Sequence, residues 1–305
     1  MTNIPLIDFE KFDNGEEKER RRISEEVNMA ASQVGFMYAK NLGIDQNILQ
    51  NAFKSSKNFF KQSLSEKSKL SYVQNMNHGY QGVGEQRLDS QFAPDLKEAF
   101  TMRDVPLREK FMDLWPSNEF RTIAARAFGE CLRGSNIVME AFAIALDLPI
   151  NYFRERHKGE NVALRYLHYP ISGKNLSANQ LGAGAHTDFG TITLLFQDDV
   201  GGLQIQNRSG QWLDAVHIQG TVIVNTADLI ATWTNDRYCS SPHRVRAITG
   251  GRERYSIAFF VDPDTDVPVS AFDSCISVDQ PAKYPATTAG AYVAQRIAES
   301  NELSG

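Results

Sequence analysis

The sequence of 305 residues contains little cysteine and no long apolar run. Its three cysteines, Cys131, Cys239 and Cys275, are too few and too scattered for a disulfide framework or a cysteine-based zinc site. Such scarcity is typical of a reducing compartment. A membrane-spanning helix needs roughly 18 or more consecutive apolar residues, which are absent, and the first residues lack the basic-then-apolar pattern of a signal peptide. We therefore expect a cytoplasmic protein that does not bind membranes.

An excess of positive charge is also missing. The chain has 32 Lys and Arg against 37 Asp and Glu, which gives a formal net charge of -5. Proteins that bind nucleic acids normally carry a basic patch for the phosphate backbone, so this balance argues against nucleic acid as a partner. Hydrophobic residues make up 42% and charged residues 23% of the chain, as in ordinary globular proteins. We expect a monomer whose partner is a small-molecule substrate.

The spacing of apolar residues changes along the chain. Before about residue 150 it follows the helical period, and helices are predicted over 16–34, from the N-cap Asp45 onward, and over 118–147. A further helix is expected at 288–299. In between, short runs rich in β-branched and aromatic residues alternate with turn signals. These runs predict strands at 162–169, 191–197, 202–206, 212–216, 221–225, 244–248 and 254–261.

Closely spaced strands of this kind favour an antiparallel barrel or sandwich. No linker rich in Gly and Ser separates the helices from the strands, so we expect one integrated unit of mixed α+β class. Within this unit we distinguish a mostly helical N-terminal region at 1–120, long supporting helices at 121–159, a strand-rich catalytic core at 160–262 and a C-terminal closing segment at 263–305.

A His-x-Asp pair, His186 and Asp188, is the first candidate for chemistry. Residues two apart in an extended strand point to the same face, so the imidazole and the carboxylate can converge. The pair is common by chance and gains meaning if a second histidine reaches it, for which His217 and His243 are candidates. Two histidines and one carboxylate on one face of a metal leave adjacent positions open, which is typical of non-haem Fe(II) oxygenases.

A second constellation, Arg254 and Ser256, provides an anchor for a carboxylate. The two residues are again two apart in a predicted strand, and arginine pairs bidentately with carboxylates while serine adds a hydrogen bond. If Gly250 and Gly251 form a two-residue hairpin loop, His243, Arg254 and Ser256 share one face of the hairpin. The arginine then lies about 13 Å along the strand from the metal ligand, a separation that suits a five-carbon diacid.

Further segments, in order along nearly the whole chain, resemble the isopenicillin N synthase-like branch of the Fe(II)/2-oxoglutarate-dependent dioxygenases. They are residues 4–8, 35–43, 59–60 with 66–67, 95–98, 169–170, 186–194, 202–204, 212, 225–228, 243–245 and 254–260. The resemblance implies a double-stranded β-helix (jelly roll) core with a helical N-terminal region. The site residues that it implies are, for the metal and for catalysis, His186, Asp188 and His243 and, for 2-oxoglutarate, Arg254, Ser256 and Tyr169.

By the same resemblance the protein is an oxidoreductase, a dioxygenase that hydroxylates, desaturates or cyclises a small molecule and releases succinate and CO2. The resemblance implies Fe(II), 2-oxoglutarate and dioxygen, with ascorbate as a reductant. Three residues depart from the family pattern: Leu42, Leu167 and Ala227 stand where a histidine, an asparagine and a glycine are usual. The second departure removes an asparagine that often touches 2-oxoglutarate.

Two other functions stay open at this point. Some relatives use the same framework without 2-oxoglutarate, as non-haem iron oxidases in which the Arg254 and Ser256 positions hold a carboxylate-bearing substrate. The other alternative is a jelly-roll binding module without catalysis. The complete set of ligand and anchor residues argues against that module.

Other residues are expected to surround the site or the core. Strand alternation favours Tyr169 toward the site and His168 away from it. The loop 77–93 is a candidate wall for the substrate, residues 182–184 are expected to form a plain turn before a strand, and Cys131 is expected in the core. Four apolar residues are available to shield the oxidant: Phe189, Leu195, Phe196 and Phe260.

Overall fold

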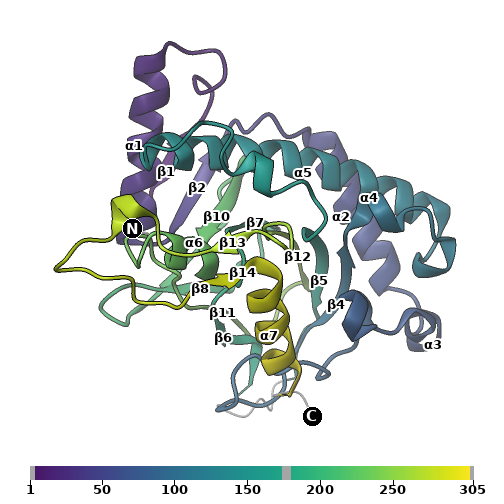
Figure 1. Ribbon diagram of the computed structural model, residues 1–305. Helices are drawn as coiled ribbons and strands as arrows, with labels where there is room; N and C mark the ends of the chain where they lie inside the picture. The colour runs from purple at the N-terminus through teal and green to yellow at the C-terminus, as the bar shows by residue number, and fades with distance from the viewer. Residues whose placement is uncertain (1–3, 174–179, 303–305) are drawn as a thin grey trace.

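The computed structural model describes residues 4–173 and 180–302, and its core is a sandwich of two β-sheets (Figure 1). The large sheet has the order β1 (Leu6–Asp8), β2 (Phe36–Lys40), β10 (Thr221–Thr226), β7 (Ile192–Gln197), β12 (Arg254–Val261), β5 (Ala163–Tyr169), β4 (Glu98–Arg103) and β3 (His78–Gln81). The small sheet has the order β6 (Leu181–His186), β11 (His243–Arg246), β8 (Leu203–Gln206) and β9 (Trp212–Asp214). A two-stranded ribbon pairs β13 (Pro268–Val269) with β14 (Thr287–Thr288).

Three long helices pack on the outer face of the large sheet: α1 (Glu17–Gln33), α2 (Gln46–Phe60) and α5 (Asn118–Ala145). A fourth long helix, α7 (Ala289–Glu302), follows β14 at the C-terminal end of the described chain. The shorter ones are α3 (Leu64–Lys67), α4 (Val105–Arg108) and α6 (Asp228–Trp233), with 3₁₀ turns at Ser68–Leu70, Gln74–Met76, Met112–Leu114, Arg154–Arg156 and Asp273–Cys275. The predicted N-cap is confirmed, because the Asp45 side chain accepts a hydrogen bond from the Asn47 amide. In the described part of the chain, no helix has the length and apolarity that a membrane crossing requires.

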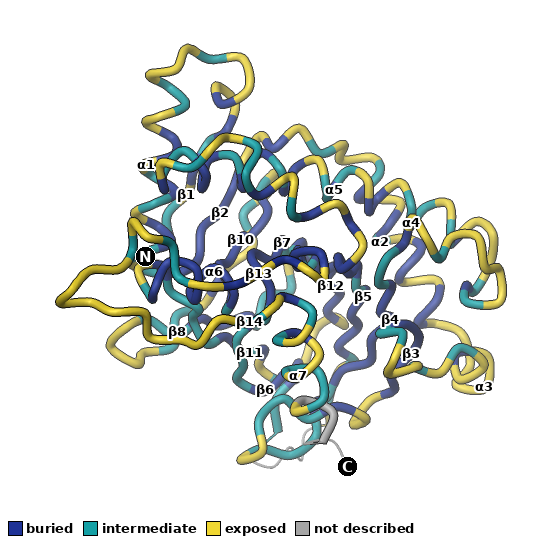
Figure 2. The backbone as a smooth tube through the Cα atoms, viewed as in Figure 1, coloured by how far each residue is buried: buried dark blue, intermediate teal, exposed yellow. Residues whose placement is uncertain are grey.

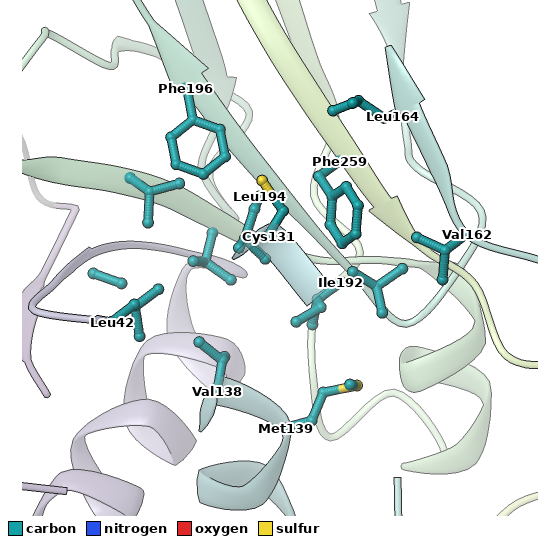
Figure 3. Close-up of a cluster of buried hydrophobic side chains, with 14 of the residues drawn as sticks. Leu42, Cys131, Val138, Met139, Val162, Leu164, Ile192, Leu194, Phe196 and Phe259 are labelled. Carbon is teal, nitrogen blue, oxygen red and sulfur yellow. The ribbon is translucent and has the colours of Figure 1, made fainter. Parts of the chain in front are cut away.

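Alternation along the central strand β7 divides the core into two layers. Leu194 and Phe196 point outward and pack beneath α5, where Cys131 and Val138 meet them (Figure 3). Thr193 and Leu195 point between the sheets instead. Cys131 is therefore a core residue, as expected, whereas the assignment of Phe196 to the shield around the site is wrong. Burial of one such large apolar side chain contributes about 1.5–3 kcal/mol. Figure 2 shows that the central strands of the large sheet are buried, as are parts of the helices that pack on it.

The predicted hairpin across Gly250 and Gly251 is wrong. β11 pairs with β6 and β8 in the small sheet, while β12 pairs with β5 and β7 in the large sheet. The segment between β11 and β12 thus crosses from one sheet to the other, which is how a jelly roll closes its two layers. The side chains still converge, because both strands direct alternate residues into the space between the sheets.

The glycines at 182 and 184 lie within β6, so the expected plain turn is also wrong. A Cβ at Gly182 would lie 2.9 Å from the carbonyl oxygen of Arg246, and one at Gly184 would lie 2.8 Å from the amide nitrogen of Asp89. The two glycines allow a neighbouring strand and a loop to approach the backbone closely. The close approach of these neighbouring segments, and not a turn, explains why glycine occupies both positions.

Candidate active site

Three potential metal ligands meet where strand β6 ends and its antiparallel neighbour β11 begins. His186 is the last residue of β6 and pairs directly with His243, the first residue of β11. Oδ1 of Asp188 lies 3.9 Å from Nε2 of His186 and 3.7 Å from Nε2 of His243. One ligand atom from each residue lies within 4.8 Å of the others. These distances suit one ion held by all three groups.

Asp188 reaches this point from a loop, because β6 ends at His186. Strand alternation, on which the sequence argument relied, therefore does not orient the carboxylate. Backbone contacts hold the loop instead: the Asp228 amide donates to the Asp188 carbonyl at 2.9 Å. The Asn225 side chain fixes the carboxylate, since its Nδ2 donates to Oδ2 of Asp188 at 2.8 Å. Oδ1 is left to face the two imidazoles.

Hydrogen bonds orient both imidazoles. Nδ1 of His186 lies 2.8 Å from the Gly184 carbonyl oxygen, and Nδ1 of His243 lies 3.3 Å from that of Ser241. A carbonyl oxygen only accepts, so each Nδ1 carries the proton and each Nε2 presents a lone pair toward the shared point. This donor set of two imidazole nitrogens and one carboxylate oxygen fits Fe(II).

The electrostatics of the cluster favour the protonation states that a metal needs. Burial lowers the pKa of His186, and the neighbouring His243 lowers it further. Burial by itself raises the pKa of Asp188, but the two imidazoles and the side-chain hydrogen bonds of Thr193 and Asn225 outweigh it, so the pKa is lowered. A neutral His186 and an ionised Asp188 can bind a cation without first losing protons.

A buried arginine lies at the other end of the cavity between the sheets, which we call the inner cavity. Arg254 pairs with Tyr169 in the β12–β5 ladder and has 0% of its surface exposed. Its Nη1 lies 3.2 Å from Oγ of Ser256, and its Nη2 lies 3.2 Å from Oε1 of Gln197. Within the described chain its Nε has no hydrogen-bond partner and no carboxylate pairs with it. A buried, unpaired guanidinium fits an anionic ligand such as the distal carboxylate of 2-oxoglutarate.

The inner cavity joins the two constellations. His186, Asp188 and His243 line it together with Tyr169, Arg254 and Ser256. His168 lies on the opposite face of β5, where its Nδ1 is 2.7 Å from Oε1 of Glu98. His217 does not belong to the ligand cluster, because its Nδ1 lies 3.1 Å from the Gln197 carbonyl oxygen.

A second cavity, the outer cavity, adjoins His186 and Asp188. The candidate wall 77–93 contributes to it, and α7 covers it with Val293 and Ile297. Of the four expected shielding residues, Phe189 and Phe260 line the outer cavity and Leu195 lines the inner one. The polar residues that the outer cavity presents are chiefly Asn77, Gln81, Gln86, Thr101, Arg165 and Asp262.

Sequence reasoning missed several of these groups. Arg165 had a usable signal, because it lies four residues before Tyr169 and shares its face of β5. Asn225 was noted only as part of a motif, and nothing local linked it to Asp188. Gln197 and Asp262 carried no local signal at all, since their positions depend on how strands from distant parts of the chain pair.

Comparisons with known proteins agree with this geometry. Residues 158–263 match the 2OG-Fe(II) oxygenase superfamily, and residues 4–118 match the N-terminal domain described as "non-haem dioxygenase in morphine synthesis N-terminal". The proline hydroxylase buaE of Petromyces alliaceus is 32% identical over 300 residues, which cover 92% of this chain and 94% of that protein. The 2-oxoglutarate-Fe(II) type oxidoreductase hxnY of Emericella nidulans is 31% identical, with 94% and 87% covered.

Solved structures show the same architecture. A full-length Neurospora crassa protein crystallised in complex with alpha-KG and thymine has a TM-score of 0.87 and 32% sequence identity, with 97% of this chain and 96% of that chain covered. JOX2 in complex with 2OG, Fe and JA has a TM-score of 0.80 and 29% identity, with 94% and 82% covered. The chain therefore belongs to the 2OG-Fe(II) oxygenase superfamily and is an Fe(II)- and 2-oxoglutarate-dependent oxidoreductase with the double-stranded β-helix fold.

Proposed function

We propose that the protein hydroxylates a compact, polar small molecule in the outer cavity. In this proposal His186, Asp188 and His243 hold Fe(II), and Arg254, Ser256 and Tyr169 hold 2-oxoglutarate in the inner cavity. The observation that carries the proposal is the shared position of His186 and Asp188, which line both cavities at once. A cosubstrate on one side and a substrate on the other can therefore reach the same metal.

Each residue has a defined task in this arrangement. When bound, the iron activates dioxygen, and oxidative decarboxylation of 2-oxoglutarate to succinate and CO2 accompanies insertion of one oxygen atom into the substrate. Arg254 orients the distal carboxylate through charge-assisted hydrogen bonds, and Ser256 adds a neutral one. The Tyr169 ring lies 4.6 Å from the guanidinium carbon of Arg254 and holds that group in place. Phe189 and Phe260 exclude water from the substrate side.

The chemistry of the outer cavity supports the choice of a compact polar substrate. Amide, guanidinium and carboxyl groups face two phenyl rings there, so a substrate needs both hydrogen-bonding groups and an apolar face. Two relatives are consistent with this class: one is named a proline hydroxylase, and the other is the Neurospora crassa protein crystallised with thymine. Hydroxylation is favoured because the first of these names specifies it.

An anaerobic titration tests the roles of the residues. Fe(II) and 2-oxoglutarate added to the protein without dioxygen should produce a metal-to-ligand charge-transfer band, and admission of dioxygen should yield succinate. His243→Ala should abolish the band, whereas His217→Ala, which alters a histidine outside the cluster, should leave it intact. A normal band in His243→Ala would overturn the ligand assignment. Substrate oxidation without any band or succinate would favour the 2-oxoglutarate-independent oxidase instead.

A further inference from the structure

Asp262 presents a carboxyl group to the outer cavity without a partner. It follows β12 directly, it is 7% exposed, and it lines the cavity beside Asp188 and Phe260. Among the described residues, none forms a hydrogen bond or ion pair with its side chain. Gly190 makes room for it, since a Cβ at that position would lie 1.9 Å from Oδ1 of Asp262.

Arg165 lines both the outer and the inner cavity, and it forms no ion pair with any residue that the structure describes. Its Nη2 donates to the side-chain oxygens of Gln81, at 3.2 Å, and of Gln86. Its buried Nε has no hydrogen-bond partner in the part of the chain that the structure describes. Arg165 pairs with Ala258 across the ladder, so Asp262 lies four positions further along β12, at about 13 Å.

An arginine and an aspartate in one cavity are expected to pair with each other, because an unpaired charge in a poorly hydrated site is costly. Here the two groups remain apart. Burial raises the pKa of Asp262 to about 7, and the charge of Asp188 adds to this effect while Arg103 opposes it. The buried carboxyl group of Asp262 is therefore poorly solvated, and a hydrogen-bond donor on a bound molecule can take the place of the missing water.

We propose that Arg165 and Asp262 form a two-ended recognition site for the substrate of the proposed hydroxylation. The substrate presents an acceptor, a carboxylate or a carbonyl oxygen, to Arg165 and a donor, an ammonium or a ring N–H, to Asp262. This chemistry describes amino acids and cyclic amides and excludes simple carboxylic acids and hydrocarbons.

Matched pairs of probes test this inference. L-Proline carries both the acceptor (its carboxylate) and the donor (its ammonium group), whereas cyclopentanecarboxylate keeps a five-membered ring and the carboxylate but lacks the donor. Thymine also carries both ends, whereas 1,3-dimethylthymine keeps the carbonyl groups and loses both N–H donors. Their binding to the enzyme loaded anaerobically with Fe(II) and 2-oxoglutarate can be followed by calorimetry and by the change in the charge-transfer band. At least one two-ended probe should bind about tenfold or more tightly than its matched analogue.

Two variants test whether Asp262 is the residue responsible for the preference for two-ended probes. Asp262→Asn should remove most of the preference for L-proline over cyclopentanecarboxylate, and Asp266→Asn, an exposed residue of the same loop, should retain it. The band with 2-oxoglutarate alone should form normally in both. A preference for thymine but not for proline identifies the cyclic amide as the ligand, and the reverse result identifies the amino acid.

Three results would overturn the inference. Both analogues could bind as well as their parent compounds, no two-ended probe could bind up to its solubility limit, or Asp262→Asn could keep the wild-type preference. Each of these, with a normal charge-transfer band, contradicts the recognition site and leaves the proposed function intact. Absence of the band in the wild-type enzyme would instead overturn the proposed function and this inference together.

Discussion

The Nδ2 group of Asn225 donates a hydrogen bond to Oδ2 of Asp188 at 2.8 Å and so leaves Oδ1 as the free carboxylate oxygen. Asn225 lies on β10 and is 3% exposed, so water cannot readily replace its amide. Groups that orient a metal ligand in this way typically contribute about 10–100-fold to metal affinity. Asn225 therefore acts through Asp188 as a positioning residue.

Asn225→Leu should weaken Fe(II) binding by about 10–100-fold, because the carboxylate loses its orienting donor. A competitive titration with a metal indicator measures this affinity directly. Asn47→Ala, which alters an exposed asparagine on α2, is the control and should bind Fe(II) normally. Wild-type affinity in Asn225→Leu would show that the loop backbone and Thr193 orient Asp188 without Asn225.

Arg254→Gln should weaken 2-oxoglutarate binding without a loss of Fe(II) affinity. A charge-assisted hydrogen bond contributes about 1.5–3 kcal/mol, which corresponds to a roughly 10–150-fold increase in the dissociation constant. The anaerobic charge-transfer band, titrated with 2-oxoglutarate, measures the change. Arg252→Gln is a matched control two residues away, because Arg252 is exposed and pairs with Asp199 on the surface. Equal effects of the two substitutions would contradict the anchoring role.

Two nearby lysines allow a comparison of a buried and an exposed ion pair. Nζ of Lys67 lies 2.6 Å from Oε2 of Glu98, and both side chains are less than a tenth exposed. Nζ of Lys69 also lies 2.6 Å from a carboxylate, that of Glu66, but these side chains are 65% and 55% exposed. Lys67→Met should lower the free energy of unfolding by about 3 kcal/mol, because Glu98 then loses its buried cation. Lys69→Met should cost less than about 1 kcal/mol.

Urea unfolding of the two lysine variants provides the measurement. If both variants lost a similar free energy of unfolding, the buried ion pair between Lys67 and Glu98 would contribute no more to stability than the exposed pair. Glu98 also accepts hydrogen bonds from Tyr80 and His168, and these contacts should keep the Lys67→Met variant folded.

His157 should make the protein less stable at mildly acid pH. Burial lowers the pKa of its imidazole to about 4, while Nδ1 is bonded to the Phe153 carbonyl and Nε2 to the Thr191 hydroxyl. In the unfolded chain the pKa returns to about 6.5, so the unfolded state takes up the proton first as the pH falls. Stability contributed by the neutral form is therefore complete above about pH 6.5 and is lost progressively toward pH 4.

Between pH 7 and pH 5 this one group should lower the free energy of unfolding by about 2 kcal/mol. His157→Gln, which preserves a donor and an acceptor, should reduce the pH dependence of urea unfolding by that amount. His217→Gln removes an exposed histidine and should leave the pH dependence unchanged. An unchanged slope in His157→Gln would show that the buried imidazole does not resist protonation.

Arg296 connects α7 to the loop that carries Asp188. Its Nη1 donates to Oδ2 of Asp228 at 2.5 Å, and its guanidinium carbon lies 4.7 Å from the centre of the Phe189 ring. Arg296→Ala should loosen the helix over the outer cavity and raise the substrate KM by about tenfold, with little change in 2-oxoglutarate affinity. Faster hydrogen exchange in α7 measures the loosening directly. Gln295→Ala, on the exposed side of the same helix, should exchange at the wild-type rate.

Local patterns in the sequence were sufficient for many elements of this protein. The helices α1, α2 and α5 follow from apolar spacing and, for α2, from the cap residue Asp45, because these signals act within a few turns of chain. The strands from β5 and from β7 to β12 follow from alternation in the same way. Strands β2, β3 and β4 were missed in the region expected to be mostly helical, and β6 was missed because its two glycines imitate a turn.

The chemistry of the site was also readable before the fold was known. The order of His186, Asp188, His243, Arg254 and Ser256 along the chain, together with the family resemblance, identified the metal and the cosubstrate. Residue type determines which ligands a group can bind, and that property does not depend on the fold.

The partners of these groups were decided only in three dimensions. Alternation states which face a residue occupies but not which strand lies beside it, so it could not show that β11 and β12 belong to different sheets. The bond from Asn225 to Asp188 forms when the two sheets close on each other, and the separation of Arg165 from Asp262 follows from the register between β5 and β12. Contacts between residues distant in sequence form only where the whole sandwich packs, and no local pattern encodes them.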